Sequence, residues 1–350
     1  MKLKNILLVL TGGTICSFAT QKGERDTDTA KAQTLIVENF RNGSSDYKSE
    51  EAVEFTPVFA LNVLSENMSV EYWNVLVEKM KSYDFERYDG VIILHGTDTL
   101  AYTASFLSLI LSGISVPVIM VSSQLPLYES EANGNANFKA AVELIVNGIK
   151  PNVYAVYRNE ETVNGEKTKA MYLHYGAHLI QCANHSNNFY SFDMAPISMK
   201  NAVFEGTCSK GDNPIFKNEK IDLLSTKVLK IQPYVGLDYS LLSLEGVDAI
   251  VHGTYHSSTV ATETTKNNSI LYLNERCKNN VPPIPLFIEP FEKAVYKTTG
   301  DALRDGILPI VNMTGEMAYV KTLVGCSLGL KGEELYGFLG KEINNEFLVP

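Results

Sequence analysis

The sequence predicts an α/β protein with a parallel sheet and two domains. Its 350 residues are many for one hydrophobic core, since cores stop growing at about 250–300 residues. Short apolar runs alternate with amphipathic helical patterns, which is typical of a parallel sheet covered by helices. Past Ala202 a polar stretch rich in turn formers interrupts the pattern, and a second α/β series follows. We expect an N-terminal catalytic domain at 1–205, a linker at 206–225 and a smaller C-terminal domain at 226–350.

Three apolar runs in the N-terminal part predict buried strands, at Ile6–Leu10, Gly90–Leu94 and Val116–Val121. Helical patterns lie among them. Ser69 is placed to cap a helix that continues to about Met80. Thr99 is placed to cap a second helix, which Gly113 closes. A third helix is expected over about 135–146.

The C-terminal part repeats the alternation on a smaller scale. We expect strands at 228–231, 248–251 and 285–288. Helices are expected near 315–328 and 331–343. No internal repeat and no low-complexity segment is evident.

Composition excludes several classes of partner. A formal charge of −10 at pH 7 argues against nucleic acid, because an acidic protein repels phosphate backbones. No apolar stretch approaches the roughly 20 residues that a membrane-spanning helix needs, so no membrane partner is expected. The five cysteines are scattered, and none form a Cys-x-x-Cys pair. This argues against a disulfide framework or a metal site and favours a reducing cytoplasm.

The first candidate for chemistry is the turn Thr11-Gly12-Gly13-Thr14-Ile15, which directly follows the first buried strand. Two glycines permit a tight turn and expose backbone N–H groups, which can hold an oxyanion or a carboxylate. Thr14 then presents a hydroxyl to the same space. Taken alone, the motif favours an ordinary strand-to-loop turn. Nearby Cys16 is a competing nucleophile, although a buried small hydrophobic residue is the simpler interpretation.

The second candidate is His95-Gly96-Thr97-Asp98-Thr99, which follows another buried strand. Here a threonine hydroxyl stands beside a carboxylate. Asp98 or Thr99 also suits a helix cap, and His95 also suits a packed core histidine. Because the carboxyl ends of parallel strands meet at one edge of a sheet, we expect the two Gly-Thr turns to converge on one cleft.

A threonine hydroxyl needs a base to become a nucleophile. Asp98 beside Thr97 offers a carboxylate, and a lysine near these groups can move the proton. Lys167 and Lys169 are candidates, although a surface lysine is the simpler interpretation of each taken alone.

The two motifs together resemble the asparaginase family, whose hallmarks are Thr-Gly-Gly-Thr-Ile and His-Gly-Thr-Asp-Thr about 85 residues apart. Ser65-Glu66-Asn67-Met68 resembles the family's substrate-binding turn, with Asn67 in place of an aspartate. Thr168-Lys169 resembles a family Thr-Lys pair, and Ser122-Ser123-Gln124 resembles a family strand end. The stretch Leu94–Ser105 is similar to the cytoplasmic type I branch.

The resemblance implies hydrolysis of L-asparagine to aspartate and ammonia, without a metal or an organic cofactor. It implies a larger, mixed but mostly parallel N-terminal sheet with helices on both faces, and a smaller C-terminal α/β domain. Thr14 is the implied nucleophile, and Thr97, Asp98 and Lys169 are the implied proton-handling triad. Formation of an acyl-enzyme on Thr14 and direct attack by water both remain open. The implied substrate-binding positions are Gly13, Ser65, Glu66, Gly96 and Ser123, and Asp98 shares the ammonium group with Glu66. A homodimer or homotetramer with sites shared between subunits is also implied.

One departure from the family concerns the segment after Thr14. The family places a tyrosine there, whereas 17–37 holds none. Tyr296 is the candidate substitute.

Two alternatives to an asparaginase remain open. The first is a related amidase, such as a glutaminase or the ammonia-supplying subunit of a transfer-RNA amidotransferase. Such subunits usually carry an N-terminal extension, and here the motif begins at residue 11, which favours the asparaginase. The second alternative is a non-catalytic amino-acid sensor with the same fold.

Overall fold

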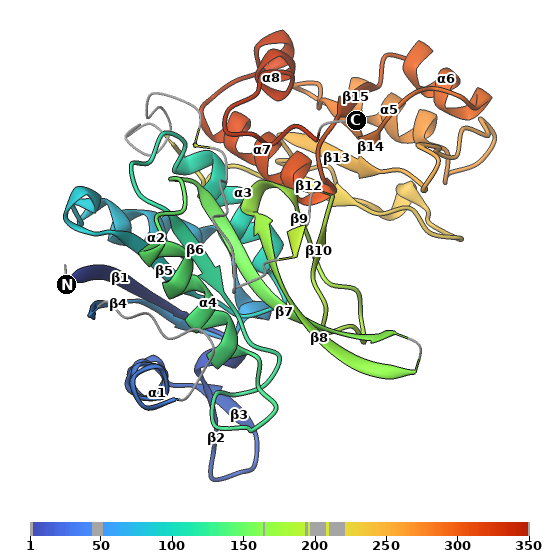
Figure 1. Cartoon of the computed structure of the whole chain (residues 1–350). Helices are drawn as coiled ribbons and strands as arrows, with labels where there is room; N and C mark the ends of the chain where they lie inside the picture. The colour runs from blue at the N-terminus through green and yellow to red at the C-terminus, as the bar shows by residue number, and fades with distance from the viewer. Residues whose placement is uncertain are drawn as a thin grey trace. The chain divides into compact units, whose positions relative to one another are not determined.

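The computed structural model describes residues 3–43, 52–163, 165–192, 195–196, 208–209 and 221–348 (Figure 1). The chain forms two compact units. The first comprises Met1–Asn218 with Ile343–Asn345, and the second comprises Glu219–Glu342 with Glu346–Pro350. The expected linker at 206–225 lies mostly outside the described residues.

A seven-stranded sheet organises the first unit, in the order β11-β8-β7-β6-β5-β1-β4. The strands β4, β1, β5, β6 and β7 run parallel, and β8 and β11 are antiparallel to their neighbours. The expectation of a mixed but mostly parallel sheet is therefore confirmed. The bounds are β1 Lys4–Gly12, β4 Val53–Val63, β5 Gly90–Leu94, β6 Val118–Val121, β7 Val153–Val163, β8 Glu166–Tyr175 and β11 Ala195–Pro196.

The order of the parallel strands creates a switch point. From β1 the chain proceeds to β4 on one side, and it then crosses back to β5 on the other side of β1. The crevice outside the carboxyl ends of two such strands is where open α/β sheets bind ligands. Here the switch point lies between β1 and β5.

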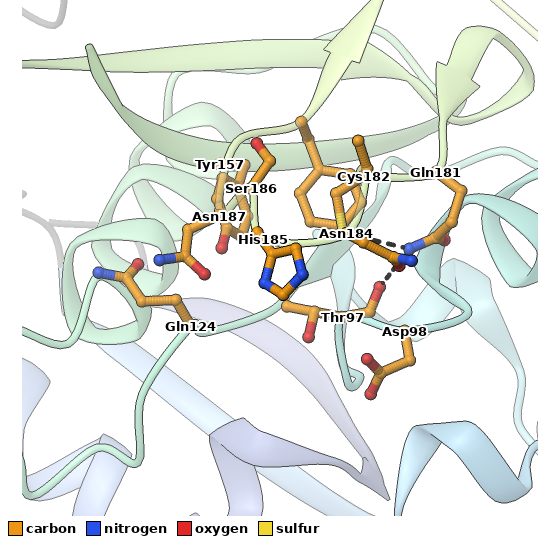
Figure 2. Close-up of a pocket in the computed structure, with 12 residues that line it drawn as sticks. Thr97, Asp98, Gln124, Tyr157, Gln181, Cys182, Asn184, His185, Ser186 and Asn187 are labelled. Carbon is orange, nitrogen blue, oxygen red and sulfur yellow. Dashed lines mark hydrogen bonds between the residues drawn. The ribbon is translucent and has the colours of Figure 1, made fainter. Parts of the chain in front are cut away.

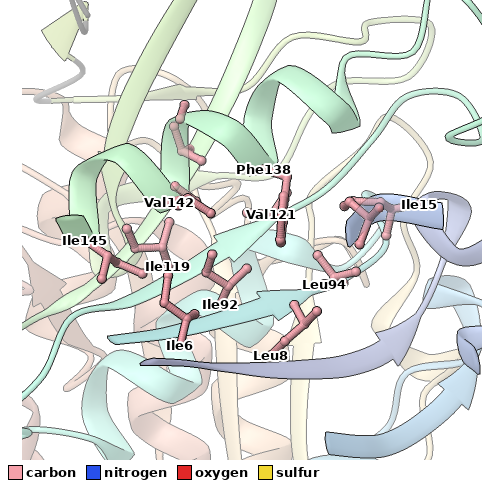
Figure 3. Packing of buried hydrophobic residues seen from close by; sticks show 14 of the residues in the cluster. Ile6, Leu8, Ile15, Ile92, Leu94, Ile119, Val121, Phe138, Val142 and Ile145 are labelled. Atoms are coloured by element: carbon pink, nitrogen blue, oxygen red, sulfur yellow. The ribbon is translucent and has the colours of Figure 1, made fainter. Parts of the chain in front are cut away.

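Helices cover both faces of this sheet, as expected. Side chains of α1 (Thr29–Asn42) and α4 (Gly134–Val146) pack on the face that carries Ile6, Leu8 and Leu10 (Figure 3). Alternate residues of β1 point to the opposite face, where Leu7 is also fully buried. The helices α2 (Val70–Lys81) and α3 (Leu100–Ile110) contact β4 and β7 respectively.

The packing of these helices is dense. Trp73 of α2 stacks on Phe106 of α3 with ring centroids 4.6 Å apart, and its indole N–H donates to the Thr103 hydroxyl at 3.0 Å. Each fully buried Leu or Ile in the core contributes about 1.5–3 kcal/mol of transfer free energy. The edge of the sheet that carries the glycine-threonine turns is therefore anchored on rigid strands and helices.

Short elements complete the first unit. They are the 3₁₀ turns η1 Thr14–Cys16, η2 Ser65–Asn67, η3 Phe85–Arg87 and η4 Gly176–His178, and the strands β2 Ser17–Ala19, β3 Arg25–Thr27, β9 Leu179–Ile180 and β10 Tyr190–Ser191. The strands pair as two small antiparallel ladders, β2 with β3 and β9 with β10.

The second unit is a smaller α/β fold around a four-stranded sheet in the order β12-β13-β14-β15, in which all neighbours are parallel. Its core includes a fully buried ion pair of 2.6 Å between Lys321 and Glu346. The elements are β12 Val228–Ile231, η5 Tyr239–Leu241, β13 Ala249–Gly253, α5 Ile270–Lys278, β14 Leu286–Phe291, α6 Lys297–Arg304, β15 Leu308–Val311, α7 Gly315–Ser327 and α8 Gly332–Leu339.

Two element boundaries differ from the prediction for clear reasons. The strand expected from Val116 begins at Val118, because Pro117 has no N–H to donate to a neighbouring strand. The last helix ends at Leu339 and not at Ile343, and Gly340 forms its C-cap. No helix in the described part of the chain is long and apolar enough to cross a membrane.

Candidate active site

Polar turns follow four neighbouring parallel strands of the first unit. Thr11–Thr14 follows β1, Ser65–Asn67 follows β4, His95–Thr99 follows β5, and Ser122–Ser123 follows β6. Parallel strands end at the same edge of the sheet, so the pattern brings these turns to the switch point. Their hydroxyl and carboxyl groups come from segments far apart in the sequence.

The turns after β1 and β5 touch through two glycines. Gly13 has φ +77°, and a Cβ built on it would lie 2.2 Å from Gly96 Cα. A Cβ on Gly96 would lie 2.3 Å from the Ser65 hydroxyl oxygen. Atoms of the neighbouring turns occupy this space, so no side chain fits at either glycine without displacing a turn. The two glycines therefore allow the turns after β1, β4 and β5 to meet.

Ser65 joins its turn to the Asp98 turn through side-chain bonds. Its hydroxyl donates to Asp98 Oδ2 at 2.6 Å and accepts from the Asp98 backbone N–H at 3.2 Å. The Thr99 hydroxyl donates to the Ser65 carbonyl at 2.9 Å. Thr99 occupies the N-cap position of α3, but its side chain makes no capping bond there. Asp98 itself is exposed, and the bond to Ser65 holds its carboxylate beside the turn after β4.

Thr14 opens the 3₁₀ turn η1 and is half-buried. Its carbonyl accepts from the Ser17 hydroxyl at 2.9 Å. Within the described residues its own hydroxyl makes no hydrogen bond, so this group is available to a ligand. The Cys16 side chain is fully buried, and burial raises the pKa of its thiol to about 12. Such a thiol stays protonated at neutral pH, which supports a packing role for Cys16.

His95 is a core residue. Its ring is fully buried, and Nδ1 lies 2.8 Å from the Gly96 carbonyl. Burial lowers its pKa to about 4, so the imidazole is neutral at pH 7. A neutral ring places the proton on Nδ1, where it donates to Gly96. The His95 carbonyl accepts from the Ser122 hydroxyl at 2.5 Å, which ties this turn to the end of β6.

A cavity of about 410 Å³ opens beside Thr97 and Asp98 (Figure 2). Its other wall is the segment that follows β9, which carries carboxamide and hydroxyl groups. Within that segment His185 has φ +62°, a conformation that non-glycine residues adopt rarely and that is often found at functional sites. The lining residues are Thr97, Asp98, Gln124, Tyr157, Gln181, Cys182, Ala183, Asn184, His185, Ser186, Asn187 and Phe189.

The remaining predicted site residues lie at different places. Ser123 is buried and fixed, since its hydroxyl donates to the Leu125 carbonyl at 2.5 Å and accepts from Gly134 N–H at 3.0 Å. Glu66 is exposed on η2. Lys169 lies on β8, where its ammonium contacts Glu131 at 3.0 Å. The structure thus brings the turns of Gly13, Ser65 and Gly96 together, with Thr14 next to Gly13 in the chain. Of the predicted site residues, Thr97 and Asp98 line the cavity. The others are not among its lining residues, and Lys169 lies on Glu131.

Comparison with known proteins identifies the family of this chain. The family model described as "Asparaginase, N-terminal" matches residues 5–203, which hold all four of these turns. The chain belongs to the asparaginase family. The sequence resemblance is thereby confirmed.

Relatives of this asparaginase-family chain differ in how much of it they match. L-asparaginase 1 of Escherichia coli K12 is 33% identical over 170 residues, which are 48% of each protein. The match therefore spans about half the length of that relative. L-asparaginase of Thermococcus kodakarensis is 26% identical across 97% of this chain and 98% of its own. A glutamyl-tRNA(Gln) amidotransferase component from Methanococcus maripaludis C6 is 28% identical across 92% of this chain and 76% of its own.

Solved asparaginases share the fold. The thermostable L-asparaginase of Thermococcus kodakarensis superposes with a TM-score of 0.72 at 21% identity, covering 99% of this chain and 100% of the other. L-asparaginase I of Vibrio cholerae superposes with a TM-score of 0.71 at 19% identity, with the same coverage. The predicted two-part asparaginase-like α/β fold is confirmed.

Several residues of this candidate site were not predicted from the sequence, and Gln181 is one of them. Gln181 lies on the cavity wall, and its carboxamide contacts the turn that carries Thr97 (Figure 2). It follows a two-residue strand and belongs to no motif, so only the folded arrangement reveals it. No group of three or more His, Cys, Asp or Glu able to hold a metal occurs among the described residues.

Proposed function

We propose that this chain hydrolyses the side-chain amide of L-asparagine to L-aspartate and ammonia, with Thr14 as the nucleophile. The observation that carries the proposal is the contact between Gly13 and Gly96, which brings two hydroxyl-bearing turns together beside Asp98. Family membership supports an amidohydrolase, and the asparaginase relatives support asparagine as its substrate.

The proposed reaction begins when Thr14 Oγ bonds to the amide carbon and gives up its proton. The amide oxygen becomes an oxyanion, which backbone N–H groups of the glycine turns stabilise. The C–N bond then breaks, and the departing nitrogen takes a proton and leaves as ammonia. Water attacks the resulting ester, which releases aspartate and returns the proton to Thr14.

The α-carboxylate and α-ammonium groups of the substrate orient its side-chain amide in the site. In the proposal Ser65 donates its hydroxyl proton to the substrate α-carboxylate and releases its present bond to Asp98, which is 2.6 Å long. The Asp98 carboxylate is then available, with Glu66, for the α-ammonium group. Gly13, Gly96 and Ser123 shape the pocket around the side-chain amide. Binding energy from these remote groups holds the amide near Thr14.

The proton relay in the proposal consists of Thr97, Asp98 and Lys169. The exposed ion pair between Lys169 and Glu131 contributes at most about 1 kcal/mol, so it opposes movement of the ammonium only weakly. Tyr296 is our candidate for the group that supports Thr14, because 17–37 has no tyrosine. Its side chain is 55% exposed in the second unit.

We further propose a homodimer or homotetramer in the cytoplasm, with the second unit of one subunit completing the site of another. All five cysteines are free thiols, which supports a reducing compartment. A structural neighbour from Campylobacter jejuni is named "Probable Cytoplasmic L-asparaginase".

A second candidate is an amidase that acts on glutamine. It is favoured by the glutamyl-tRNA(Gln) amidotransferase relative, whose match covers 92% of this chain. Both reactions use the same nucleophile, and they differ in the length of the substrate side chain by one methylene. A pocket distinguishes such substrates by about 1–3 kcal/mol.

Substrate choice is tested by ammonia release from L-asparagine and from L-glutamine under identical conditions. We expect kcat/KM for asparagine to exceed that for glutamine by at least about 10-fold. The reverse preference would establish the second candidate. Absence of turnover with both, together with a higher Tm in the presence of aspartate, would instead establish a binding-only sensor.

A further inference from the structure

We infer that Gln181 is a positioning residue that holds the catalytic turn Thr97–Asp98 in place from the opposite wall of the cavity. The inference rests on the proposed function, since it assigns Gln181 a role in the same site. The contacts that carry it join the Gln181 side chain to backbone atoms on either side of Asp98. Gln181 therefore acts through the backbone of the turn.

The carboxamide bridges two points of one turn. Its Nε2 donates to the Thr97 carbonyl at 2.8 Å (Figure 2). Its Oε1 accepts from the Ala101 backbone N–H at 3.2 Å. The two contacts lie four residues apart along the chain and enclose Asp98. A side chain that binds both ends of a turn restricts the orientation of the residues between them.

The contact between Gln181 and the Ala101 N–H caps helix α3, whose own N-cap residue makes no capping bond. Ala101 is in the first turn of α3, where backbone N–H groups have no partner within the helix. Thr99, in the N-cap position, uses its hydroxyl on the Ser65 carbonyl and makes no capping bond. The oxygen of Gln181 therefore satisfies a donor that a Ser or Thr cap ordinarily satisfies.

Glutamine suits this place because it combines a donor and an acceptor on one planar group. Glutamate keeps the acceptor for Ala101 and loses the donor for Thr97. Methionine, of similar length, loses both. The pair of substitutions thus separates helix capping, a structural role, from the bond to the catalytic turn.

The experiment compares Gln181→Glu, Gln181→Met and the control Gln33→Met, which lies on α1 away from the cavity. We expect Gln181→Glu to lower the Tm less than Gln181→Met does, because its carboxylate still caps the Ala101 amide although it no longer donates to Thr97. We expect its kcat/KM for asparagine to fall about 10- to 100-fold, since small misplacements of catalytic groups have effects of this size. Gln181→Met is expected to lose both activity and some stability. The control retains both.

A double variant tests whether Gln181 acts through Thr97. In the Thr97→Ala background, Gln181→Met should lower kcat/KM less than about 3-fold, because residues that act as a unit are not additive. Wild-type kcat/KM in Gln181→Glu would overturn the inference. Full additivity in the double variant would exclude the Thr97 hydroxyl as the group that Gln181 positions and leave Asp98.

A measurement without substrate separates this inference from the proposed function. Hydrogen exchange of the Ala101 amide is expected to accelerate in Gln181→Met and to stay slow in Gln181→Glu. If the wild-type protein releases no ammonia while exchange behaves as expected, the proposed function fails and the positioning role stands. If exchange at Ala101 is unchanged in Gln181→Met, the positioning role fails whatever the activity.

Discussion

At the scale of single residues, the site needs positions without a side chain next to positions whose side chains form hydrogen bonds. Gly13 and Gly96 must have no side chain, whereas Ser65 and Asp98 must have theirs within hydrogen-bond reach. The sequence allowed both threonine turns to be predicted, because each glycine-threonine pair follows an apolar run. It did not allow Gln181 to be predicted, since its partners are backbone atoms about 80 residues away in the chain.

His95 predicts a pH dependence of stability. Burial lowers its pKa from the ordinary 6.5 to about 4, so the folded state binds less proton than the unfolded state between these values. Above about pH 6.5 the His95 ring does not reduce the free energy of unfolding. As the pH falls from about 6.5 to about 4, protonation of the ring in the unfolded state lowers that free energy by roughly 3 kcal/mol. His95→Asn keeps a donor for the Gly96 carbonyl and removes the titrating ring.

Thermal unfolding followed from pH 7.5 to pH 4 tests this claim. We expect the midpoint of the first unit to fall less steeply with pH in His95→Asn than in the wild type. The exposed residue His256 provides the control, and His256→Asn should follow the wild-type slope. Parallel slopes for His95→Asn and the wild type would show that the ring does not carry the proton linkage.

At the scale of elements, the buried strands were predictable and the polar ones were not. β1, β5 and β6 are short apolar runs, and the prediction located each of them. β4 has mostly exposed or half-exposed side chains and contains Pro57, which an edge strand tolerates. The β7–β8 hairpin carries a charged outer half held by cross-strand pairing, which an apolar pattern does not reveal. In contrast, the sequence did indicate where α1 begins, because Asp28 is a typical N-cap residue and its side chain accepts from the Lys31 backbone N–H.

The hairpin provides a test of the proposed proton relay. Lys167 and Lys169 lie two residues apart on β8, and each ammonium contacts a glutamate. We expect Lys169→Met to lower kcat about 100-fold or more, which is the usual range for loss of a general acid or base. The Tm should change little, because an exposed ion pair contributes at most about 1 kcal/mol.

Lys167→Met is the matched control, since it removes a neighbouring surface cation from the same strand. It should keep wild-type kcat for asparagine. Near-normal turnover in Lys169→Met would remove Lys169 from the relay, in agreement with its present place on Glu131.

At the scale of the whole molecule, the alternation of strands and helices predicts the fold of one chain. It does not predict how subunits associate. Each unit has a core and a sheet of its own, and the sheet is mostly parallel in the first unit and parallel in the second. One chain's sequence carries no pattern that specifies the surface of its partner. A shared site was therefore available only from the family resemblance, and it stands as a proposal.

Complementation between inactive variants tests the shared site. Thr14→Ala and Tyr296→Phe are expected to be inactive or nearly so as separate proteins. After the two are unfolded and refolded together, a dimer with shared sites should recover about a quarter of wild-type activity, because half of the dimers are mixed and each mixed dimer has one intact site. Each variant refolded alone is the control. No recovery, with mixed dimers shown by mass spectrometry, would place each site within one chain.

The central claim is that the Thr14 hydroxyl attacks the side-chain amide of asparagine, and one measurement tests it most directly. The initial rate of ammonia release from L-asparagine is compared among the wild type, Thr14→Ala and Thr11→Ala. Thr11 is the control because its hydroxyl is buried and donates to the Leu94 carbonyl at 2.8 Å. We predict that Thr14→Ala lowers kcat at least about 1,000-fold with an unchanged Tm, and that Thr11→Ala retains turnover. Turnover by Thr14→Ala within about 10-fold of the wild type would contradict the claim.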